Sequence, residues 1–423
     1  MPASLEEHLF APGPKRVLSL DGGGVRGIVS IAFLREIEKV LKERFGRADF
    51  RLCDYFDLVG GTSVGSLLAA LITLGYPVSE IEKMFREWGP EIFRRPWIGV
   101  PGFRPRFSSH GLKKRVQQVL KDCTLESQEF KTGLAIIAKR VDTGSPWVLT
   151  NNPRAKYWKD PEDRSYIGNR HYRVSDLVIA SAAAPTFFAP KRIRILSKEL
   201  ARTLPKELRR HQEIGSFVDG AVSPFNDPSL QLLMLAGLKG HGFNWKLGSN
   251  RLHMVSVGAG SYRMPLVAGF LDRRFPHIFA VKALFGLIGD AQNLSLTLMQ
   301  WYSAPSRPWK INSEIGAMEG ELLSPSEEDG EPRPLLSYVR YDVLLEEGWL
   351  EENLGRTTTA EELEKLKQLD RPEMINELND IGTLAAAKQV REEDFPACFG
   401  PSSTVSSLMS INLSRSVHAA EKK

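Results

Sequence analysis

Ser63 lies at the centre of the pentapeptide G-T-S-V-G, which runs from Gly61 to Gly65. A strand-like apolar run precedes it and a helical pattern follows it, which is the setting in which G-x-S-x-G exposes a serine hydroxyl. Gly61 and Gly65 would allow the sharp turn, and the hydroxyl would then lie at the positive end of the following helix. The motif therefore predicts a nucleophilic serine, with a plain glycine-rich turn capped by Ser63 as the alternative.

A nucleophilic serine needs a base that accepts its proton, and Asp219 is the base that the sequence offers. It follows a short apolar run and precedes the small residues Gly220 and Ala221, so we expect it at the C-terminal edge of a sheet, beside the serine turn. The histidines after Ser63 occur singly, and His253 lies in an apolar strand pattern typical of a core. Since D-G is also a common turn signal, Asp219 taken alone could equally be structural.

A glycine cluster near the N-terminus forms the third group, and its members with their polar neighbours are Asp21, Gly22, Gly23, Gly24 and Arg26. Together with Gly27 it fits the dinucleotide pattern G-x-G-x-x-G, in which N–H groups at a helix N-terminus hold a pyrophosphate. That interpretation would assign Asp49 to the ribose, but the Asp21 carboxylate would then lie close to the phosphates. The same N–H groups can instead stabilise the oxyanion of a tetrahedral intermediate.

Units of strand, turn and helix must position these three groups. Apolar runs at residues 17–20 and 55–59 predict two strands, each followed by a glycine turn and a helical pattern. Further buried strands are predicted at 132–138, 217–218 and 252–257, with helical patterns between them. This order predicts an α/β fold with a mainly parallel central sheet.

The composition is that of a globular protein and excludes several other classes. Of the 423 residues, 42% are hydrophobic and 25% are charged, and the net charge of +5 is too small to indicate nucleic-acid binding. The three cysteines form no C-x-x-C pair, which favours neither a disulfide framework nor a zinc site. The N-terminus has no secretory pattern, and the apolar stretches 67–74 and 278–288 are shorter than the about 18 residues that cross a bilayer. We therefore expect a cytoplasmic protein whose membrane contact is peripheral.

The three groups, with the stretch A-S-A-A-A-P-T-F-F-A-P at 180–190 and N-D-P downstream of Asp219, resemble the patatin-like phospholipase family over residues 15–262. The resemblance implies a three-layer α/β/α fold and a serine lipid acyl hydrolase of phospholipase A type. It implies that Ser63 is the nucleophile, that Asp219 is the base, and that no metal or other cofactor takes part. It assigns the oxyanion hole to Gly22, Gly23, Gly24 and Arg26. Two positions, Ser66 after the turn and Ala221 in place of the more frequent glycine, depart from the family pattern and keep the residues small.

On this basis we divide the chain into an N-terminal segment 1–14, a catalytic domain 15–262 with a basic insertion at 191–210, a helical C-terminal extension 263–400 and a flexible tail 401–423. The extension resembles the C-terminal parts of bacterial patatin-like proteins, among them antiphage effectors switched on by cyclic oligonucleotides, and this resemblance implies such an activator. The segment 93–107, rich in arginine and aromatic residues, suits an anionic membrane surface, or else a solvated loop. The apolar residues between Phe270 and Ile288 would line an acyl channel or, alternatively, pack on the sheet.

The partners that we expect are a phospholipid membrane surface, bound peripherally at its inner face, and a cyclic-oligonucleotide activator. Self-association into a homo-oligomer stays open, and nucleic acid is not expected as a partner. Two other functions are kept as alternatives. An acyltransferase of related fold would carry a histidine just before the nucleophile, where this chain has Thr62. A lipid- or nucleotide-sensing module with a vestigial site would not need the intact serine, aspartate and glycines.

Overall fold

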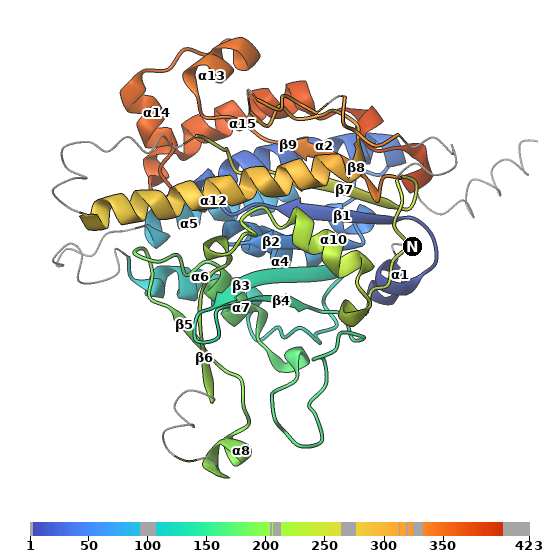
Figure 1. Ribbon diagram of the computed structural model, residues 1–423, viewed down its shortest axis with the longest axis vertical. Coiled ribbons are helices and arrows are strands. Elements are labelled where there is room, and N and C mark those ends of the chain that lie inside the picture. Colours follow the sequence, from blue (N-terminus) through green and yellow to red (C-terminus); the bar gives the residue numbers. More distant parts are fainter. Residues whose placement is uncertain are drawn as a thin grey trace, which may run out of the picture.

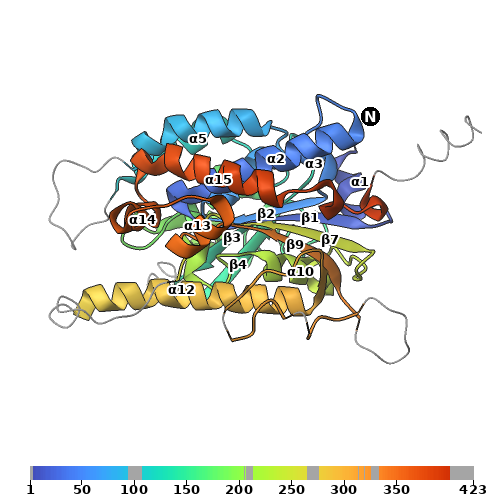
Figure 2. The ribbon, with the colours of Figure 1, turned by 90° about the horizontal axis from the view of Figure 1, so that it is seen from above.

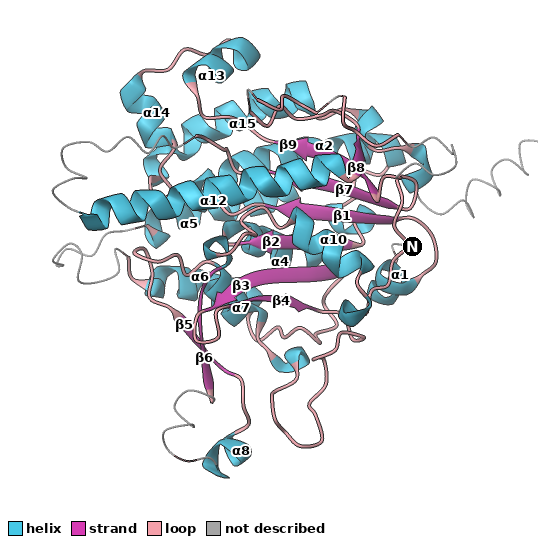
Figure 3. Cartoon of the chain, viewed as in Figure 1, coloured by secondary structure: helices cyan, strands magenta, loops and turns pink. Residues whose placement is uncertain are grey.

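The computed structural model describes residues 3–93, 107–203, 205, 213–263, 276–312, 314–318, 320–324 and 333–400. These residues form a sheet with helices on both sides (Figures 1 and 3). The segment between Phe93 and Phe107 and the tail 401–423, for which the sequence predicts membrane contact and flexibility, lie outside the described residues. Within the described ranges, no helix has both the length and the apolar character that crossing a bilayer requires.

The described strands form one nine-stranded sheet in the order β5-β6-β3-β2-β1-β7-β9-β8, and β4 pairs with β3 as a branch. Strands β1, β2, β3, β7, β8 and β9 are parallel, whereas β4 and β6 are antiparallel to β3, and β5 is antiparallel to β6. The strands are β1 (Lys15–Leu20), β2 (Leu58–Thr62), β3 (Gly133–Arg140), β4 (Ser145–Thr150), β5 (Lys191–Arg194), β6 (Ile214–Asp219), β7 (Leu252–Val257), β8 (Ser303–Pro305) and β9 (Leu336–Tyr341). A parallel sheet is covered on both faces, and every residue of β7 is accordingly buried.

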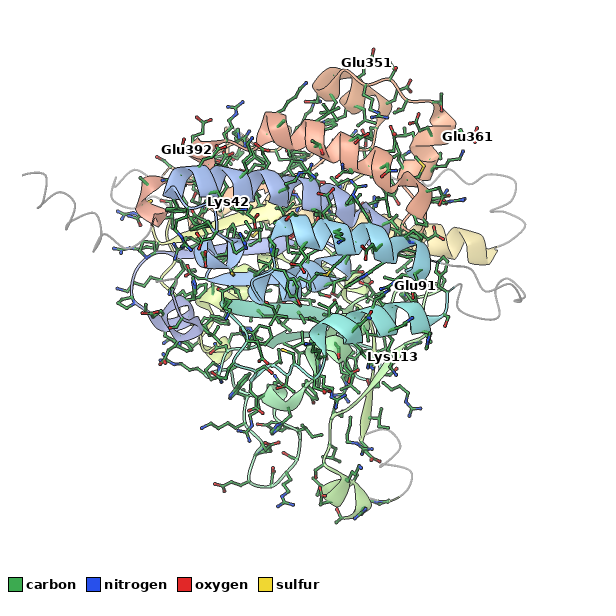
Figure 4. The ribbon with its side chains drawn as sticks, turned by 180° about the vertical axis from the view of Figure 1, so that it is seen from behind. Lys42, Glu91, Lys113, Glu351, Glu361 and Glu392 are labelled. Carbon is green, nitrogen blue, oxygen red and sulfur yellow. The ribbon has the colours of Figure 1, made fainter. Side chains whose placement is uncertain are left out.

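Helices cover both faces of the sheet and so make three layers (Figure 2). Helices α2, α5 and α15 lie on one face, and α10 and α12 lie on the other. The helices are α1 (Leu5–Phe10), α2 (Gly27–Phe45), α3 (Leu52–Tyr55), α4 (Val64–Thr73), α5 (Val78–Ile92), α6 (Ser109–Leu120), α7 (Val174–Ser181), α8 (Lys198–Thr203), α10 (Ser229–Gly237), α12 (Pro276–Trp301), α13 (Glu347–Leu354), α14 (Ala360–Leu366) and α15 (Ile375–Gln389). The side of α2 and α5, seen from behind, carries charged side chains such as Lys42 and Glu91 (Figure 4).

Each face of the sheet has its own cluster of buried apolar side chains. Leu18 and Leu20 of β1 belong to the cluster under α2, whereas Val17 belongs to the cluster under α10, because successive strand residues point to opposite faces. The α/β class with three layers and a mainly parallel sheet, expected from the sequence, is confirmed.

Residues 263–400, expected to be a helical extension, contribute two strands as well as helices. Strand β9 pairs in parallel with both β7 and β8, so this part of the chain completes the sheet that holds the catalytic candidates. Ser337 and Arg340 interrupt the apolar residues of the sequence L-S-Y-V-R-Y, so it lacks the continuous apolar run that predicts a buried strand. All six residues of β9 are nevertheless buried. The basic segment 191–210, expected to be helical, begins with β5 and continues into the short helix α8.

Candidate active site

Ser63 lies on a sharp turn between the end of β2 and the start of α4. Its backbone has a φ of 54°, a value that residues other than glycine rarely adopt. The flanking glycines make the turn possible, because a Cβ on Gly61 would lie 2.1 Å from the carbonyl oxygen of Gly65 and one on Gly65 would lie 2.2 Å from that of Leu20. The turn presents Ser63 to a cavity, as the G-x-S-x-G motif predicts.

Three hydrogen bonds support this strained backbone. The Ser63 N–H donates to Ser181 Oγ over 2.8 Å, and Ser181 Oγ donates in turn to the carbonyl of Ile137 over 2.6 Å. Ser66 Oγ donates to the Ser63 carbonyl over 2.6 Å. From the sequence, Ser66 is only a small residue after the turn, and nothing distinguishes Ser181 within the small-residue stretch 180–190.

Asp219 is the hydrogen-bond partner of the Ser63 hydroxyl. Ser63 Oγ donates to Asp219 Oδ2 over 2.7 Å, and Asp219 Oδ1 accepts the N–H of Ala221 over 2.9 Å. Only 3% of Asp219 is exposed, and burial raises its pKa to about 6 because two hydrogen bonds do not replace the lost hydration of the charged form. Asp219 is therefore ionised at neutral pH and more basic than an exposed aspartate. Ala221 does not have a positive φ, so the alanine at this position causes no strain.

Ser63 and Asp219 are adjacent because two strands meet end to end. Strand β2 pairs with β3 up to Thr62, which lies opposite Ile137. Strand β6 runs the opposite way and ends with Asp219 opposite Ala138, the next residue of β3. Since β4 pairs along this whole stretch of β3 and a strand has only two edges, β2 and β6 share the other edge. The Asp219 carboxylate therefore lies where β2 ends and the serine turn begins.

The glycine cluster lies next to Ser63, and its N–H groups are not equivalent. A Cβ on Gly22 would lie 3.1 Å from the Cβ of Ser63, so the loop and the nucleophile are in direct contact. The Gly22 N–H already donates to the carbonyl of Asn226 over 3.0 Å. The N–H groups of Gly23 and Gly24 find no acceptor in the part of the chain that the structure describes, and Gly24 has a φ of 57°, which favours glycine. Gly23 and Gly24 thus have donors to offer to an oxyanion.

Arg26 contacts the backbone beside the glycine cluster. Its Nη1 donates to the carbonyl of Gly260 over 2.7 Å, and its guanidinium carbon lies 5.0 Å from the ring centre of Tyr262. These contacts are typical of a residue that shapes the loop. Asp49, which the dinucleotide interpretation assigns to a ribose, has a largely exposed side chain that pairs with Arg47.

The serine, the aspartate and the glycine cluster open into a cavity of about 490 Å³. Apolar side chains from two parts of the chain line it. Helices α5, α6 and α7 and the residues after α7 contribute Trp88, Ile92, Leu112, Val178, Phe187 and Phe188, and α12 and the segment after it contribute Leu284, Phe285, Ile288, Leu296 and Ile311. Leu284, Phe285 and Ile288 of the apolar segment 270–288 therefore face the cavity, whereas Leu287 is exposed. His253 is fully buried, burial lowers its pKa to about 3, and it is not among the lining residues. Among the described residues, no group of three or more His, Cys, Asp or Glu side chains is arranged to hold a metal ion.

The chain was compared with protein families, with curated proteins and with solved structures. A family model described as patatin-like phospholipase matches residues 18–233. The "cGAMP-activated phospholipase" of Vibrio cholerae serotype O1 is 32% identical over 192 residues, which are 44% of this chain and 51% of that protein. "Patatin-T5" of Solanum tuberosum is 31% identical over 227 residues, which are 52% of each chain. Among solved structures, human GIVD cytosolic phospholipase A2 aligns with 93% of this chain and 62% of its own, at 12% identity and a TM-score of 0.44. The match spans about half the length of the sequence relatives.

Proposed function

Because the chain belongs to the patatin-like phospholipase family, we propose that it hydrolyses fatty-acyl esters of membrane phospholipids with a Ser63–Asp219 dyad. The observation that carries this proposal is the 2.7 Å hydrogen bond from Ser63 Oγ to Asp219, at a strained turn that faces an apolar cavity. A serine becomes a nucleophile when a neighbouring base takes its proton. An apolar lining with a few polar groups at one point suits a lipid acyl chain with its ester at the dyad.

In the acylation step, Ser63 Oγ attacks the ester carbonyl carbon and its proton passes to Asp219 Oδ2. The carbonyl oxygen becomes an oxyanion, and the N–H groups of Gly23 and Gly24 are the proposed donors to it. Each such donor is typically worth roughly 3 to 4 kcal/mol of barrier. The intermediate then expels the lysophospholipid alkoxide, which takes the proton from Asp219, and the acyl chain stays on Ser63 as an ester.

Water hydrolyses this acyl-enzyme in the second step. Asp219 takes a proton from the water, the resulting hydroxide attacks the acyl carbonyl, and the fatty acid leaves as Ser63 regains its proton. The pKa of about 6 suits both roles, because the carboxylate is ionised before each attack and yet holds a proton well enough to pass it to a leaving group.

Two alternatives, an acyltransferase and a sensing module, fit the site less well. The residue before the nucleophile is Thr62, whose Oγ1 donates to the carbonyl of Phe225 over 2.6 Å, so this position supplies no base for a second acyl acceptor. A sensing module with a vestigial site has no need of a strained turn, because such a turn destabilises the fold by about 1–3 kcal/mol and is typical of functional sites.

We extend the proposal to activation by a cyclic oligonucleotide. This part rests on the relative in Vibrio cholerae that is named a cGAMP-activated phospholipase, and on the resemblance of the extension to antiphage effectors. The protein would act as a peripheral protein at the inner face of the membrane. The same proposal assigns it to antiphage defence, where its activity would be low until the nucleotide is present.

The test is mass-spectrometric detection of free fatty acid and lysophospholipid released from liposomes of phosphatidylethanolamine and phosphatidylglycerol. Wild type, Ser63→Ala and the matched control Ser145→Ala, an exposed serine on β4, are compared with and without cGAMP and other cyclic oligonucleotides. We expect release by the wild type and by the control, and none by Ser63→Ala. Equal release by all three proteins would contradict the dyad, and release that no nucleotide increases would contradict the activation.

A further inference from the structure

Arg340 of β9 is buried and makes a two-pronged ion pair with Asp21, the residue before the glycine cluster. Its Nη1 is 3.0 Å from Asp21 Oδ1 and its Nη2 is 2.6 Å from Asp21 Oδ2. Asp21 is the residue between the end of β1 and Gly22, and only 1% of it is exposed. A paired guanidinium and carboxylate in this geometry fix each other's orientation as well as their distance. Arg340 therefore holds the first residue of the loop that contacts Ser63.

The other contacts of Arg340 anchor it to the sheet. Its Nη1 donates to Ser256 Oγ of β7 over 2.7 Å and lies 3.5 Å from Asp227, and its Nη2 donates to Asp342 Oδ2 over 2.7 Å. The guanidinium thus faces the carboxylates of Asp21, Asp227 and Asp342. Burial opposes its charged form, but these carboxylates raise the pKa of Arg340 well above its ordinary range. Arg340 is a permanent cation, and its loss would leave carboxylates buried without a counter-charge.

A second contact from the same part of the chain reaches the loop. The N–H of Val25 donates to the carbonyl of Leu369 over 3.0 Å, and a Cβ on Gly24 would lie 2.4 Å from that carbonyl oxygen. Arg26, on the far side of the loop, donates to Gly260, whose own N–H donates to Asp342 over 3.0 Å. All of these supports depend on residues beyond 233, where the match to the family model ends.

We propose that Arg340 is a positioning residue, which acts through Asp21 to place the N–H groups of Gly23 and Gly24 where the oxyanion forms. This inference rests on the proposed function for its catalytic consequence, but the placement of the loop can be measured without any activity. It gives the extension a part in the chemistry in addition to its contribution to the cavity wall.

The test compares Arg340→Lys with the control Arg16→Lys. Arg16 is partly exposed but forms a similar two-pronged pair with the buried Asp57, with two 3.0 Å contacts, at the opposite ends of β1 and β2 from Ser63. Hydrogen–deuterium exchange of residues 21–26 is the first readout, because the N–H groups of Gly22 and Val25 are bonded there. We expect at least about tenfold faster exchange in this segment for Arg340→Lys and none of this effect for Arg16→Lys, since local opening depends on local contacts. Unchanged exchange in Arg340→Lys would overturn the proposal.

The second readout is kinetic. Arg340→Lys should lower kcat by roughly 100-fold with KM changed less than about twofold, because a displacement of about 1 Å at a reacting centre costs that much. The affinity for a trifluoromethyl ketone analogue of the acyl chain, which forms an oxyanion on Ser63, should fall by the same factor, whereas the affinity for the matching alcohol should not change. Equal loss of affinity for both compounds would indicate general damage and overturn the positioning role.

If Arg340→Lys does not fold, Asp21→Asn serves in its place, since it removes the charge of the pair and keeps the shape. A wild type without esterase activity would contradict the proposed function. The hydrogen–deuterium exchange result would then decide whether Arg340 positions the glycine loop.

Discussion

Burying the Asp219 carboxylate beside Ser63 should have two consequences, a base for catalysis and a less stable fold. Replacing Asp219 by asparagine separates them. Burial raises the pKa of Asp219 from an ordinary 3.8 to about 6, and one pKa unit corresponds to about 1.4 kcal/mol. The ionised carboxylate therefore destabilises the folded protein by about 3 kcal/mol at pH 7.5. Asparagine has the same shape and can still accept the N–H of Ala221, but it carries no charge. We expect the variant to lose activity by roughly 10²–10⁴-fold and to be more stable than the wild type by up to about 3 kcal/mol.

The pH dependence of this gain gives the decisive measurement. A carboxyl group whose pKa is higher in the folded state stabilises the fold at low pH, and this contribution is lost as the pH rises through its folded pKa. The difference in unfolding free energy between Asp219→Asn and wild type, measured by urea denaturation, should be largest above about pH 6 and should vanish near pH 4. A variant that is less stable than the wild type at pH 7.5, or a gain that is the same at both pH values, would refute the reasoning.

Asp142→Asn is a control in which the sign reverses. Burial alone would raise the pKa of Asp142, but hydrogen bonds from the Arg140 guanidinium and the Ser216 N–H lower it below its ordinary value. Ionised Asp142 therefore stabilises the fold at neutral pH, and its replacement should lower the unfolding free energy there. The two substitutions are chemically identical, so opposite effects would isolate the environment of each carboxylate as the cause.

Three further predictions concern the same site. In pH–rate profiles, kcat/KM should rise with pH through about 6 as Asp219 loses its proton and should then level off; a flat profile would contradict its role as base. Gly65→Ala should lower the unfolding free energy by about 1 to 3 kcal/mol or more, because its Cβ would lie 2.2 Å from a backbone oxygen of Leu20. The control Gly348→Ala has open space around the new Cβ and should raise the unfolding free energy by about 0.5–1 kcal/mol. Thermal or urea unfolding measures both changes. Leu112→Trp should fill part of the cavity and shift the preference toward shorter acyl chains in competition assays with mixed chain lengths; an unchanged preference would show that the acyl chain lies elsewhere.

The serine turn could be predicted from the sequence because its causes are local. The φ of Ser63 and the close approaches at Gly61 and Gly65 all arise within a few residues of each other and of one neighbouring strand. The pairing with Asp219 could be expected from the order of the motifs, but the sequence does not reveal that β6 is antiparallel and meets β2 end to end. Strand direction depends on pairing partners that a local pattern does not contain.

Arg340 and Ser181 could not be predicted because their roles depend on distant partners. Arg340 pairs with a residue 319 positions away in the chain, and a charged residue within a short apolar run does not by itself predict a buried strand. Ser181 lies in a stretch of small residues in which any serine would look alike, and only its 2.8 Å contact with the Ser63 N–H distinguishes it. The unequal roles of Gly22 and its neighbours likewise depend on Asn226, which occupies one N–H of the loop.

The place of β9 inside the sheet has a consequence for the order of synthesis. A nascent chain that has emerged from the ribosome only as far as β7 contains Ser63, Asp219 and the glycine loop, but it lacks Arg340. Asp21 and Asp227, whose charges repel each other, would then lie together without the Arg340 guanidinium, and β7 would pair with β1 but lack its second partner strand, β9. We therefore expect the loop to remain unformed during translation and to close only after β9 has been made and has docked. For an enzyme proposed to cleave membrane phospholipids, this delay would keep unfinished chains inactive at the site of their synthesis.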